Sequence, residues 1–342
     1  KVSLFTNNDS AYETAISLNN SGVTVNSVVD IRDKTNSLIV KQAEKLGIKI
    51  HWKSSVVNTS GYKKINSIEI MKLSDDGTAV VGKKTKEECD CLGISGGWTP
   101  RVHLFTQSGG KLKFRDEDNV FLPDKSGLDQ ISIGSCNGDF ELDQVIKNSV
   151  SSTNKFLKVN NNDYENLEII TSKEIDKKNI WLLPSDKPLG KTKPFLDFQN
   201  DSTANDIKLA LREGFKSIEH VKRYTTTGMA TDQGKLSNMH ALGIIAETAG
   251  VKMGELGTTT FRPPYTPLTF GAIVGRNVGE FFDITRRTPI HDWHVENKAE
   301  FENVGQWKRA WYYPIENENM YEAVQRESKA ARDSAGILDA ST

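Results

Sequence analysis

The sequence has no long apolar run, few cysteines and no excess of either charge, and each shortage excludes a class of protein. No apolar stretch approaches the roughly 20 residues of a membrane-spanning helix, so no membrane partner is expected. The 44 basic and 45 acidic residues give a net charge of -1, which gives no reason to expect a nucleic-acid partner. Three cysteines, Cys89, Cys91 and Cys136, are too few for a disulfide framework and are typical of the cytoplasm.

The sequence also lacks a recognisable catalytic or metal-binding constellation. We find no Ser/His/Asp or Cys/His nucleophile arrangement and no acid/base pair of carboxylates, so no residue is predicted to be catalytic. Cys89 and Cys91 have no partner ligands. His291 and His294 lie three residues apart without a third ligand, so we expect a packing role for them and predict no metal site.

What the chain does contain is enough material for two or three globular domains. It has 342 residues, of which 37% are hydrophobic and 26% charged. It opens directly in a strand-like run without an initiator Met, and it ends in a helical pattern followed by the start of a strand, over 331–342. We therefore expect an internal fragment of a longer protein.

The first 150 residues alternate between strand and helix patterns. The strand-like runs are 2–5, 23–30 and 48–52, and the helical patterns between them are 9–20 and 36–46. This order predicts right-handed crossovers and a parallel sheet. The later expected elements are strands at 56–59, 65–73, 92–97, 119–122 and 130–134, a hairpin turn at 75–77, and a helix at 139–150.

The second half reads as mostly helical. A polar, aperiodic connection over 154–189 comes first. The helical patterns that follow cover 203–214, 217–225, 237–249, 289–299 and 320–334, with a proline-rich loop over 258–269.

The signals for dinucleotide binding conflict in the first unit. Such a unit needs a glycine turn after its first strand, where backbone N–H groups approach a pyrophosphate. Residues 6–12 contain no glycine, although Asp30 ends the second strand at the position of a ribose-binding acid. A nucleotide site and a purely structural α/β layer both remain open, and the missing glycine favours the structural layer.

Two later turns, 93–97 and 134–138, end apolar strands in glycine, which lets a cofactor or a second chain approach the backbone. Together they resemble the returning half of a flavoprotein fold in which one dinucleotide domain is inserted into another. We predict that both turns converge on one cleft, whose remaining half would be supplied from upstream of Lys1. Two ordinary turns in a β-meander are the alternative.

Seven stretches spread over nearly the whole chain are distinctive: FTNNDSAY at 5–12, GGWTPRVHLF at 96–105, FLDFQND at 195–201, REG at 212–214, HVKRYTTTGMATDQGK at 220–235, TFRPPYTP at 260–267 and WKRAWY at 307–312. In these stretches the sequence resembles one family, the α (large) subunit of heterotetrameric sarcosine oxidase. The resemblance implies a complex with β, γ and δ subunits that oxidises sarcosine to glycine, with formaldehyde or methylene-tetrahydrofolate and hydrogen peroxide as the other products. This is one-carbon metabolism, and the fragment is expected to be inactive alone.

The resemblance implies three cofactors. NAD is assigned to the two glycine turns, through Gly96, Gly97, Trp98, Gly134, Ser135 and Asn137. FMN is expected at the interface with the β subunit, its phosphate held by Lys222, Arg223, Thr225, Thr226, Gln233 and Lys235, because cations and hydroxyls on a loop suit a phosphate. A solvated basic helix end is the alternative for this loop. Tetrahydrofolate is expected to bind largely beyond residue 342.

The segment from residue 195 resembles a small [2Fe–2S] domain, but it lacks the ligands. Such a cluster needs four thiolates. The matching positions hold Asp197, Gln199, Asp232 and Ser237, whose groups do not hold iron–sulfur clusters in this way. We therefore predict this fold without a cluster.

The expected fold class is a two-dinucleotide-binding-domain α/β fold, followed by this cluster-less helical domain and the start of an aminomethyltransferase domain resembling the glycine-cleavage T protein. Residues 1–90 are predicted to form an inserted NAD(P)-binding-like domain, and 91–150 the returning half of the first dinucleotide-binding domain. A linker follows over 151–194. The helical domain with its proline-rich loop covers 195–285, and the start of the folate-binding domain covers 286–342. Two other functions remain: a non-catalytic interaction module, favoured by the glycine-free turn, and a large subunit of an opine or proline dehydrogenase, disfavoured by the missing cysteines.

Overall fold

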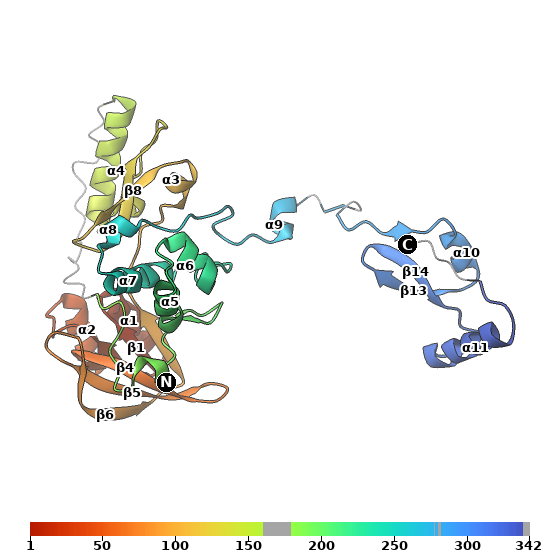
Figure 1. Ribbon diagram of the computed structural model, residues 1–342, viewed down its shortest axis with the longest axis horizontal. Coiled ribbons are helices and arrows are strands. Elements are labelled where there is room, and N and C mark those ends of the chain that lie inside the picture. Colours follow the sequence, from red (N-terminus) through yellow and green to blue (C-terminus); the bar gives the residue numbers. More distant parts are fainter. Residues whose placement is uncertain (160–178, 277, 280–281, 338–342) are drawn as a thin grey trace. The chain divides into compact units, whose positions relative to one another are not determined.

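The computed structural model describes residues 1–159, 179–276, 278–279 and 282–337. The chain divides into two compact units, Lys1–Pro267 and Leu268–Thr342 (Figure 1). The division falls earlier than the boundary predicted at 285/286. Residues 258–267 of the proline-rich loop belong to the first unit, where Lys235 Nζ donates a 2.7 Å hydrogen bond to the Tyr265 carbonyl.

Four parallel strands in the order β3-β2-β1-β7 form the first layer, which confirms the predicted parallel sheet. The strands are β1 (Val2–Thr6), β2 (Val25–Asp30), β3 (Lys49–His51) and β7 (Cys91–Ser95), and the helices are α1 (Ser10–Asn20) and α2 (Leu38–Lys45). β7 pairs with β1 along its whole length, from Val2↔Cys91 to Thr6↔Ser95. The structure thus corrects the boundary predicted at residue 90, since 91–95 complete this sheet. Gly93 lies opposite Leu4 in this pairing, and a Cβ there would lie 2.5 Å from the end of the Leu4 side chain.

The two faces of this sheet are buried against different partners. Leu4 and Val28 pack with α1 and α2, whereas the next residues, Phe5 and Val29, pack on the opposite face, as the alternation of a strand requires. The second face is covered by three antiparallel strands, β4 (Ser54–Gly61), β5 (Ile65–Leu73) and β6 (Val80–Glu88). Burial on both sides agrees with the buried apolar residues at consecutive positions, Leu4 and Phe5 in β1 and Val28 and Val29 in β2.

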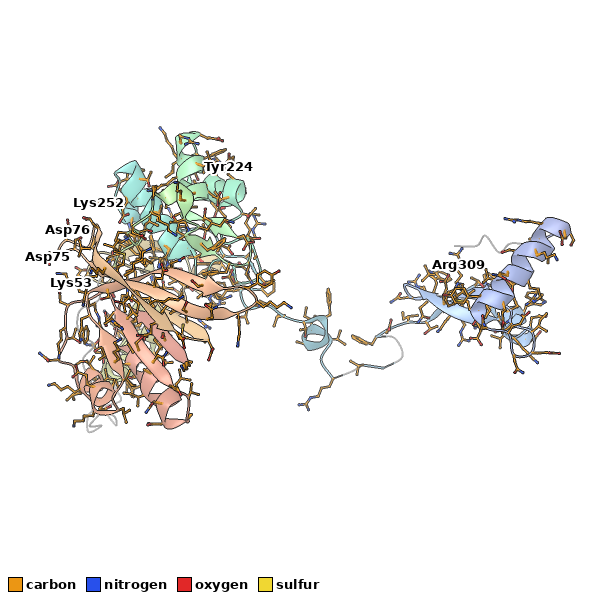
Figure 2. The ribbon with its side chains drawn as sticks, turned by 90° about the horizontal axis from the view of Figure 1, so that it is seen from below. Lys53, Asp75, Asp76, Tyr224, Lys252 and Arg309 are labelled. Atoms are coloured by element: carbon orange, nitrogen blue, oxygen red, sulfur yellow. The ribbon has the colours of Figure 1, made fainter. Side chains whose placement is uncertain are left out.

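The turn between β5 and β6 lies where the sequence predicts it. Asp75 pairs with Lys53, which precedes β4, and Asp76 lies beside them (Figure 2). Hydrogen bonds from Ser74 and Thr78 lower the pKa of Asp76 to about 2. Gly77 has a φ of 74°, the left-handed conformation that favours glycine.

A short hairpin and a long helix follow the sheet. The elements are α3 (His103–Gln107), β8 (Lys111–Arg115), β9 (Val120–Lys125), the 3-10 turn η1 (Gly134–Asn137) and α4 (Leu142–Leu157). The strand predicted at 119–122 is confirmed as β9. The strand predicted at 130–134 is a loop instead, because Gln130 hydrogen-bonds to Ser108 and Ser126. α4 continues through the domain boundary predicted at residue 150.

In the part of the chain that the structure describes, four helices and a two-stranded sheet build the rest of the first unit. They are β10 (Phe195–Asp197), β11 (Ser202–Thr203), α5 (Ala204–Arg212), α6 (Ile218–Thr225), α7 (Asn238–Ala249) and α8 (Met253–Leu256), after the 3-10 turn η2 (Leu189–Lys191). The three predicted helices are confirmed as α5, α6 and α7. Their core includes Ile207, Val221 and Ile245, and it also takes in Phe121 of the hairpin.

The segment predicted as a linker is partly packed. Residues 160–178 lie outside the described residues. Beyond them, Trp181 and Leu182 pack against the helical core, whereas Ile180 and Leu183 pack against the sheet core. Four consecutive residues therefore join two hydrophobic cores.

The second unit is a small α/β arrangement with strand order β12-β14-β13. Its elements are α9 (Phe270–Val274), β12 (Arg286–Arg287), α10 (His291–Glu296), β13 (Glu300–Val304), β14 (Trp307–Tyr312) and α11 (Met320–Asp333). The hairpin β13–β14 was not predicted. His294 is buried and its Nδ1 hydrogen-bonds to the Tyr313 hydroxyl, which agrees with the expected packing role.

No helix within the described part of the chain has the length and apolar character needed to cross a membrane. Within the same residues, no group of three or more His, Cys, Asp or Glu side chains could hold a metal ion.

Candidate functional site

The carboxyl ends of β1, β2 and β7 meet at one edge of the first sheet, where α/β folds of this topology bind ligands. The loop after β1 is organised by Asn8, whose side chain is fully buried. Asn8 Oδ1 accepts a 3.1 Å hydrogen bond from the backbone N–H of Ser10, the first residue of α1. Asn8 Nδ2 donates to the Ser95 carbonyl and hydroxyl at 3.3 and 3.2 Å. This one amide thus satisfies a helix N–H and joins the ends of β1 and β7.

The acid at the end of β2 is enclosed by side chains of the chain itself. Asp30 is 0% exposed, and it accepts hydrogen bonds from the Tyr12 hydroxyl at 2.8 Å and from the Arg32 backbone N–H at 2.9 Å. The Arg32 guanidinium pairs with Asp30 and with Asp9, each at 2.8 Å. Burial, and then the charge of Asp30, raises the pKa of Tyr12 well above its usual value, so the phenol remains a donor. We call Asp9, Tyr12, Asp30 and Arg32 the Arg32 network.

The structure brings the first predicted glycine turn to this same edge. Trp98 Nε1 donates a 3.2 Å hydrogen bond to Ser10 Oγ. A Cβ on Gly97 would lie 3.9 Å from Asn7 Oδ1, and one on Gly96 would lie 3.4 Å from the His240 ring on α7. Gly96, Gly97 and Trp98 therefore contact the loop after β1 and the start of α7.

The second predicted turn has other neighbours. A Cβ on Gly134 would lie 3.5 Å from Val145 of α4, and one on Gly138 would lie 2.7 Å from Arg115 and Leu122 of the hairpin. Ser135 and Asn137 are exposed. These contacts differ from those of the first turn, so a cleft shared by both turns stays a prediction that the contacts do not support.

The residues predicted to hold an FMN phosphate lie around the end of α6 and the turn before α7, but most have partners within the chain. Arg223 pairs with Glu219 at 2.7 Å. Gln233 Nε2 donates to the carbonyls of Arg262 and Pro264 at 2.8 and 2.9 Å.

Lys235 and Thr225 are held in the same way. The Lys235 ammonium lies 4.1 Å from the centre of the Tyr265 ring and donates to the Tyr265 carbonyl. Thr225 is buried, with its hydroxyl donating to the Val221 carbonyl at 2.8 Å. The Thr226 hydroxyl donates to the Thr225 carbonyl at 2.6 Å. Gln233 and Lys235 thus fasten the proline-rich loop to the helical domain.

Lys222 differs from its neighbours. It is half-buried on α6, and within the described residues its ammonium makes no hydrogen bond. Burial lowers the pKa of Lys222, and the nearby charges of Arg262 and Arg223 act in the same direction while Glu219 opposes them. It is the cation of this set that can accept a new anionic partner without breaking an existing bond.

Three of the four positions matched to cluster ligands instead organise loops by hydrogen bonds. Asp197 is 2% exposed, and its carboxylate accepts the backbone N–H groups of Gln199, Asn200 and Gly228 at 2.9, 3.1 and 2.7 Å. Gln199 Oε1 accepts the N–H of Asp232 at 3.1 Å. The fourth position, Ser237, is buried at the start of α7. One carboxylate therefore joins the 197–200 turn to the end of α6.

Two hollows of the surface lie away from the predicted residues. One of about 340 Å³ is lined by Phe114 and Asn119 of the hairpin, by Glu247 of α7, and by Trp181 and Lys252, the last of which is labelled in Figure 2. The other, of about 480 Å³, lies beside α2 and β3 and is lined by residues that include Lys34 and Trp52.

Sequence reasoning missed the residues that fill the edge of the sheet. Asn8, Tyr12 and Arg32 were not singled out, although Asp30 was. The available signal was Arg32 itself, a cation two residues after an acid at a strand end.

The chain has relatives along its whole length. Residues 191–276 match the sarcosine oxidase A3 domain, and residues 290–342 match the GCVT N-terminal domain. The chain is 37% identical over 352 residues to the sarcosine oxidase subunit alpha of Corynebacterium sp. (strain P-1) and 34% identical over 356 residues to that of Rhizobium meliloti (strain 1021). These alignments cover 100% and 99% of this chain but 36% and 33% of the relatives, so the chain spans about a third of their length.

A solved structure, L-proline dehydrogenase from P. horikoshii, is similar with a TM-score of 0.53 at 16% identity, over 80% of this chain and 54% of that one. At this identity the likeness shows the fold alone. Together with the two domain matches, it confirms the predicted layout of a two-dinucleotide-binding-domain fold, a helical domain and the start of an aminomethyltransferase domain.

Proposed function

From this kinship with sarcosine oxidase α subunits, we propose that the chain is part of the large subunit of an enzyme that oxidatively demethylates sarcosine to glycine. Formaldehyde or methylene-tetrahydrofolate and hydrogen peroxide would be the other products, and bound flavin would carry the electrons from the amine to oxygen. The single observation that supports this most is 34–37% identity along the whole chain to subunits of that name. We infer β, γ and δ partner subunits and a cytoplasmic location on the same basis.

For NAD, we propose the second glycine turn as this chain's contribution. Ser135 and Asn137 expose a hydroxyl and an amide, and Gly134 has a φ of 70° that lets the backbone turn sharply between them. The contacts of Gly96, Gly97 and Trp98 are already made to the chain's own residues.

For FMN, we propose that α6 faces the flavin site at the subunit interface and that Lys222 supplies the cation for its phosphate. Arg223, Gln233 and Lys235 would act indirectly, because their bonds to Glu219 and to the proline-rich loop fix the surface around Lys222. Thr225 and Thr226 would shape the end of the helix. An ammonium binds phosphate as a compact point charge, and partial burial strengthens the attraction.

We further propose that the helical domain holds no iron–sulfur cluster. The Asp197 carboxylate already accepts three backbone N–H groups, and an amide and a hydroxyl are poor iron–sulfur ligands. The second unit would begin the tetrahydrofolate domain, since its sequence matches the GCVT N-terminal domain.

The test is reconstitution of the full-length protein with its partner subunits, followed by sarcosine-dependent oxygen uptake and flavin analysis. Lys222→Met should lower FMN occupancy at least fivefold, whereas Lys222→Arg should retain most of it. Lys216→Met, at an exposed site just before α6, is the matched control. Normal FMN occupancy in Lys222→Met would exclude the phosphate role, and absence of sarcosine oxidation by the intact complex would exclude the function.

A non-catalytic interaction role is the second candidate for the first α/β layer alone. It is favoured by Asn8 and Arg32, which occupy the edge of the sheet where a ligand would bind.

A further inference from the structure

The ligand-binding edge of the first α/β layer is filled by the chain's own side chains. We propose that this layer holds no nucleotide, because Asn8, the Arg32 network and Trp98 occupy the places of the pyrophosphate, the ribose and the covering loop. The inference deepens the proposed function, since it assigns NAD binding to the other dinucleotide domain.

The place of the pyrophosphate, at the start of α1, is filled by hydrogen bonds within the chain. In a nucleotide-binding layer, free N–H groups at the start of the first helix meet the phosphates across a glycine turn. Here the N–H of Ser10 is bonded to Asn8 Oδ1, and the N–H of Tyr12 is bonded to the Asp9 carbonyl at 3.0 Å. Every residue from 6 to 12 carries a Cβ, so the backbone cannot be approached as closely as at a glycine turn.

The place of the ribose is filled as well, because the acid that would bind it already has hydrogen-bond partners within the chain. A ribose-binding acid must offer an oxygen to the 2′-hydroxyl of the sugar. Both oxygens of Asp30 already accept hydrogen bonds, Oδ1 from the Arg32 N–H and Nε at 2.9 and 3.1 Å, and Oδ2 from the Tyr12 hydroxyl at 2.8 Å. The carboxylate is 0% exposed, so a sugar could reach it only after Arg32 had moved.

Arg32 also spans the crevice between the two places. Its guanidinium bonds Asp30 at the end of β2 and Asp9 in the loop after β1, and its side chain is 3% exposed. An entering nucleotide would have to break a buried ion pair on each side of this cation. Such pairs are strongly unfavourable to break because the remaining charges stay buried.

Trp98 completes the arrangement from β7. Its indole N–H is bonded to Ser10 Oγ while the ring itself remains 64% exposed. Ser10 is thus bonded to both Asn8 and Trp98, and its hydroxyl already has partners within the chain.

The experiment compares variants of this edge with a variant of the second turn in the full-length protein assembled with its partners. Ser10→Ala and Trp98→Phe remove polar atoms of the edge without opening the core, and Asn137→Ala does the same at the exposed second turn. NAD dissociation constants are measured by calorimetry, with melting temperatures checked for each variant. We expect Ser10→Ala and Trp98→Phe to stay within twofold of the parent and Asn137→Ala to weaken NAD at least tenfold.

Hydrogen–deuterium exchange of the parent gives a second readout that needs no variant. Amides of residues 6–12 and 96–98 should exchange at the same rate with and without 1 mM NAD. Protection of these amides, or a tenfold loss of affinity in Ser10→Ala or Trp98→Phe at unchanged melting temperature, would overturn the inference. If the parent binds no NAD and these amides stay unprotected, the inference holds and the proposed NAD binding fails.

Discussion

Replacing Arg32 with methionine tests the physical basis of the filled edge. Arg32→Met keeps much of the side-chain volume but removes the only cation that the structure places between Asp9 and Asp30 among the described residues. The three side chains are 3%, 10% and 0% exposed, so water cannot replace the lost charge. Removing one partner of a buried ion pair costs about 3–5 kcal/mol.

This loss is large compared with the stability of a typical domain, which is about 5–15 kcal/mol. It should lower the melting temperature by roughly 6–20 °C in a unit of this size. Because the chain has more than one unit, native-state hydrogen exchange of the β1 and β2 amides is the assay that reports on this layer by itself.

Lys34→Met is the matched control, since it breaks a lysine–glutamate pair of 3.2 Å whose side chains are 59% and 39% exposed. An exposed pair contributes about 0–1 kcal/mol. Adding Asp9→Asn to Arg32→Met should restore part of the stability, because one of the two unpaired charges is removed. Equal effects of Arg32→Met and Lys34→Met would refute the reasoning.

Three further predictions concern other buried contacts. Glu87 joins β6 to the first sheet through Ser27, His51 and Lys49, and although burial alone would raise its pKa, these partners lower it below the usual value. The stabilisation by Glu87 is therefore present above its unfolded-state pKa and is lost as the pH falls through its folded-state pKa. Glu87→Gln should accordingly lower the free energy of unfolding by about 1–3 kcal/mol at pH 7 and by almost nothing in acid. A difference in urea unfolding that does not change with pH would contradict this. Asp197→Ala should lower the free energy of unfolding by about 2–4 kcal/mol, because three backbone N–H groups lose their acceptor. Asp197→Asn should lower it less. In thermal melts the control Asp201→Asn, at an exposed site, should be nearly neutral. Gly243→Ala should destabilise α7 by about 1–3 kcal/mol, because a Cβ there would lie 2.1 Å from Trp181. This loss should outweigh the higher helix propensity of alanine. Recovery of stability when Gly243→Ala is combined with Trp181→Leu would identify the clash as the cause.

Much of the fold could be predicted because it depends on local periodicity. The apolar spacing of α5, α6 and α7 and the strand–helix alternation of the first layer are properties of contiguous residues. The position of β7 could not be predicted in the same way. Its neighbour β1 lies almost ninety residues earlier, and the glycine-rich run at 91–97 suits either dinucleotide domain.

The candidate site shows the same limit. Asp30 was found because an acid at a strand end is a sequence signal, but the return of Arg32 onto it depends on side-chain geometry. Lys235 and Gln233 were predicted to face a phosphate, and that role remains a prediction. Their carbonyl partners lie about thirty residues further on, in the proline-rich loop, where no local pattern indicates them.

The Arg32 network also constrains how this layer can change over time. A substitution of Arg32 leaves the carboxylates of Asp9 and Asp30 without their cation inside the protein, and a further substitution of one aspartate reduces that cost. Opening the crevice by removing Arg32 alone would therefore pass through an unstable protein with two unpaired carboxylates. The order of mutations therefore matters in this layer: loss of the arginine first is strongly disfavoured, whereas loss of one aspartate first leaves the other ion pair in place.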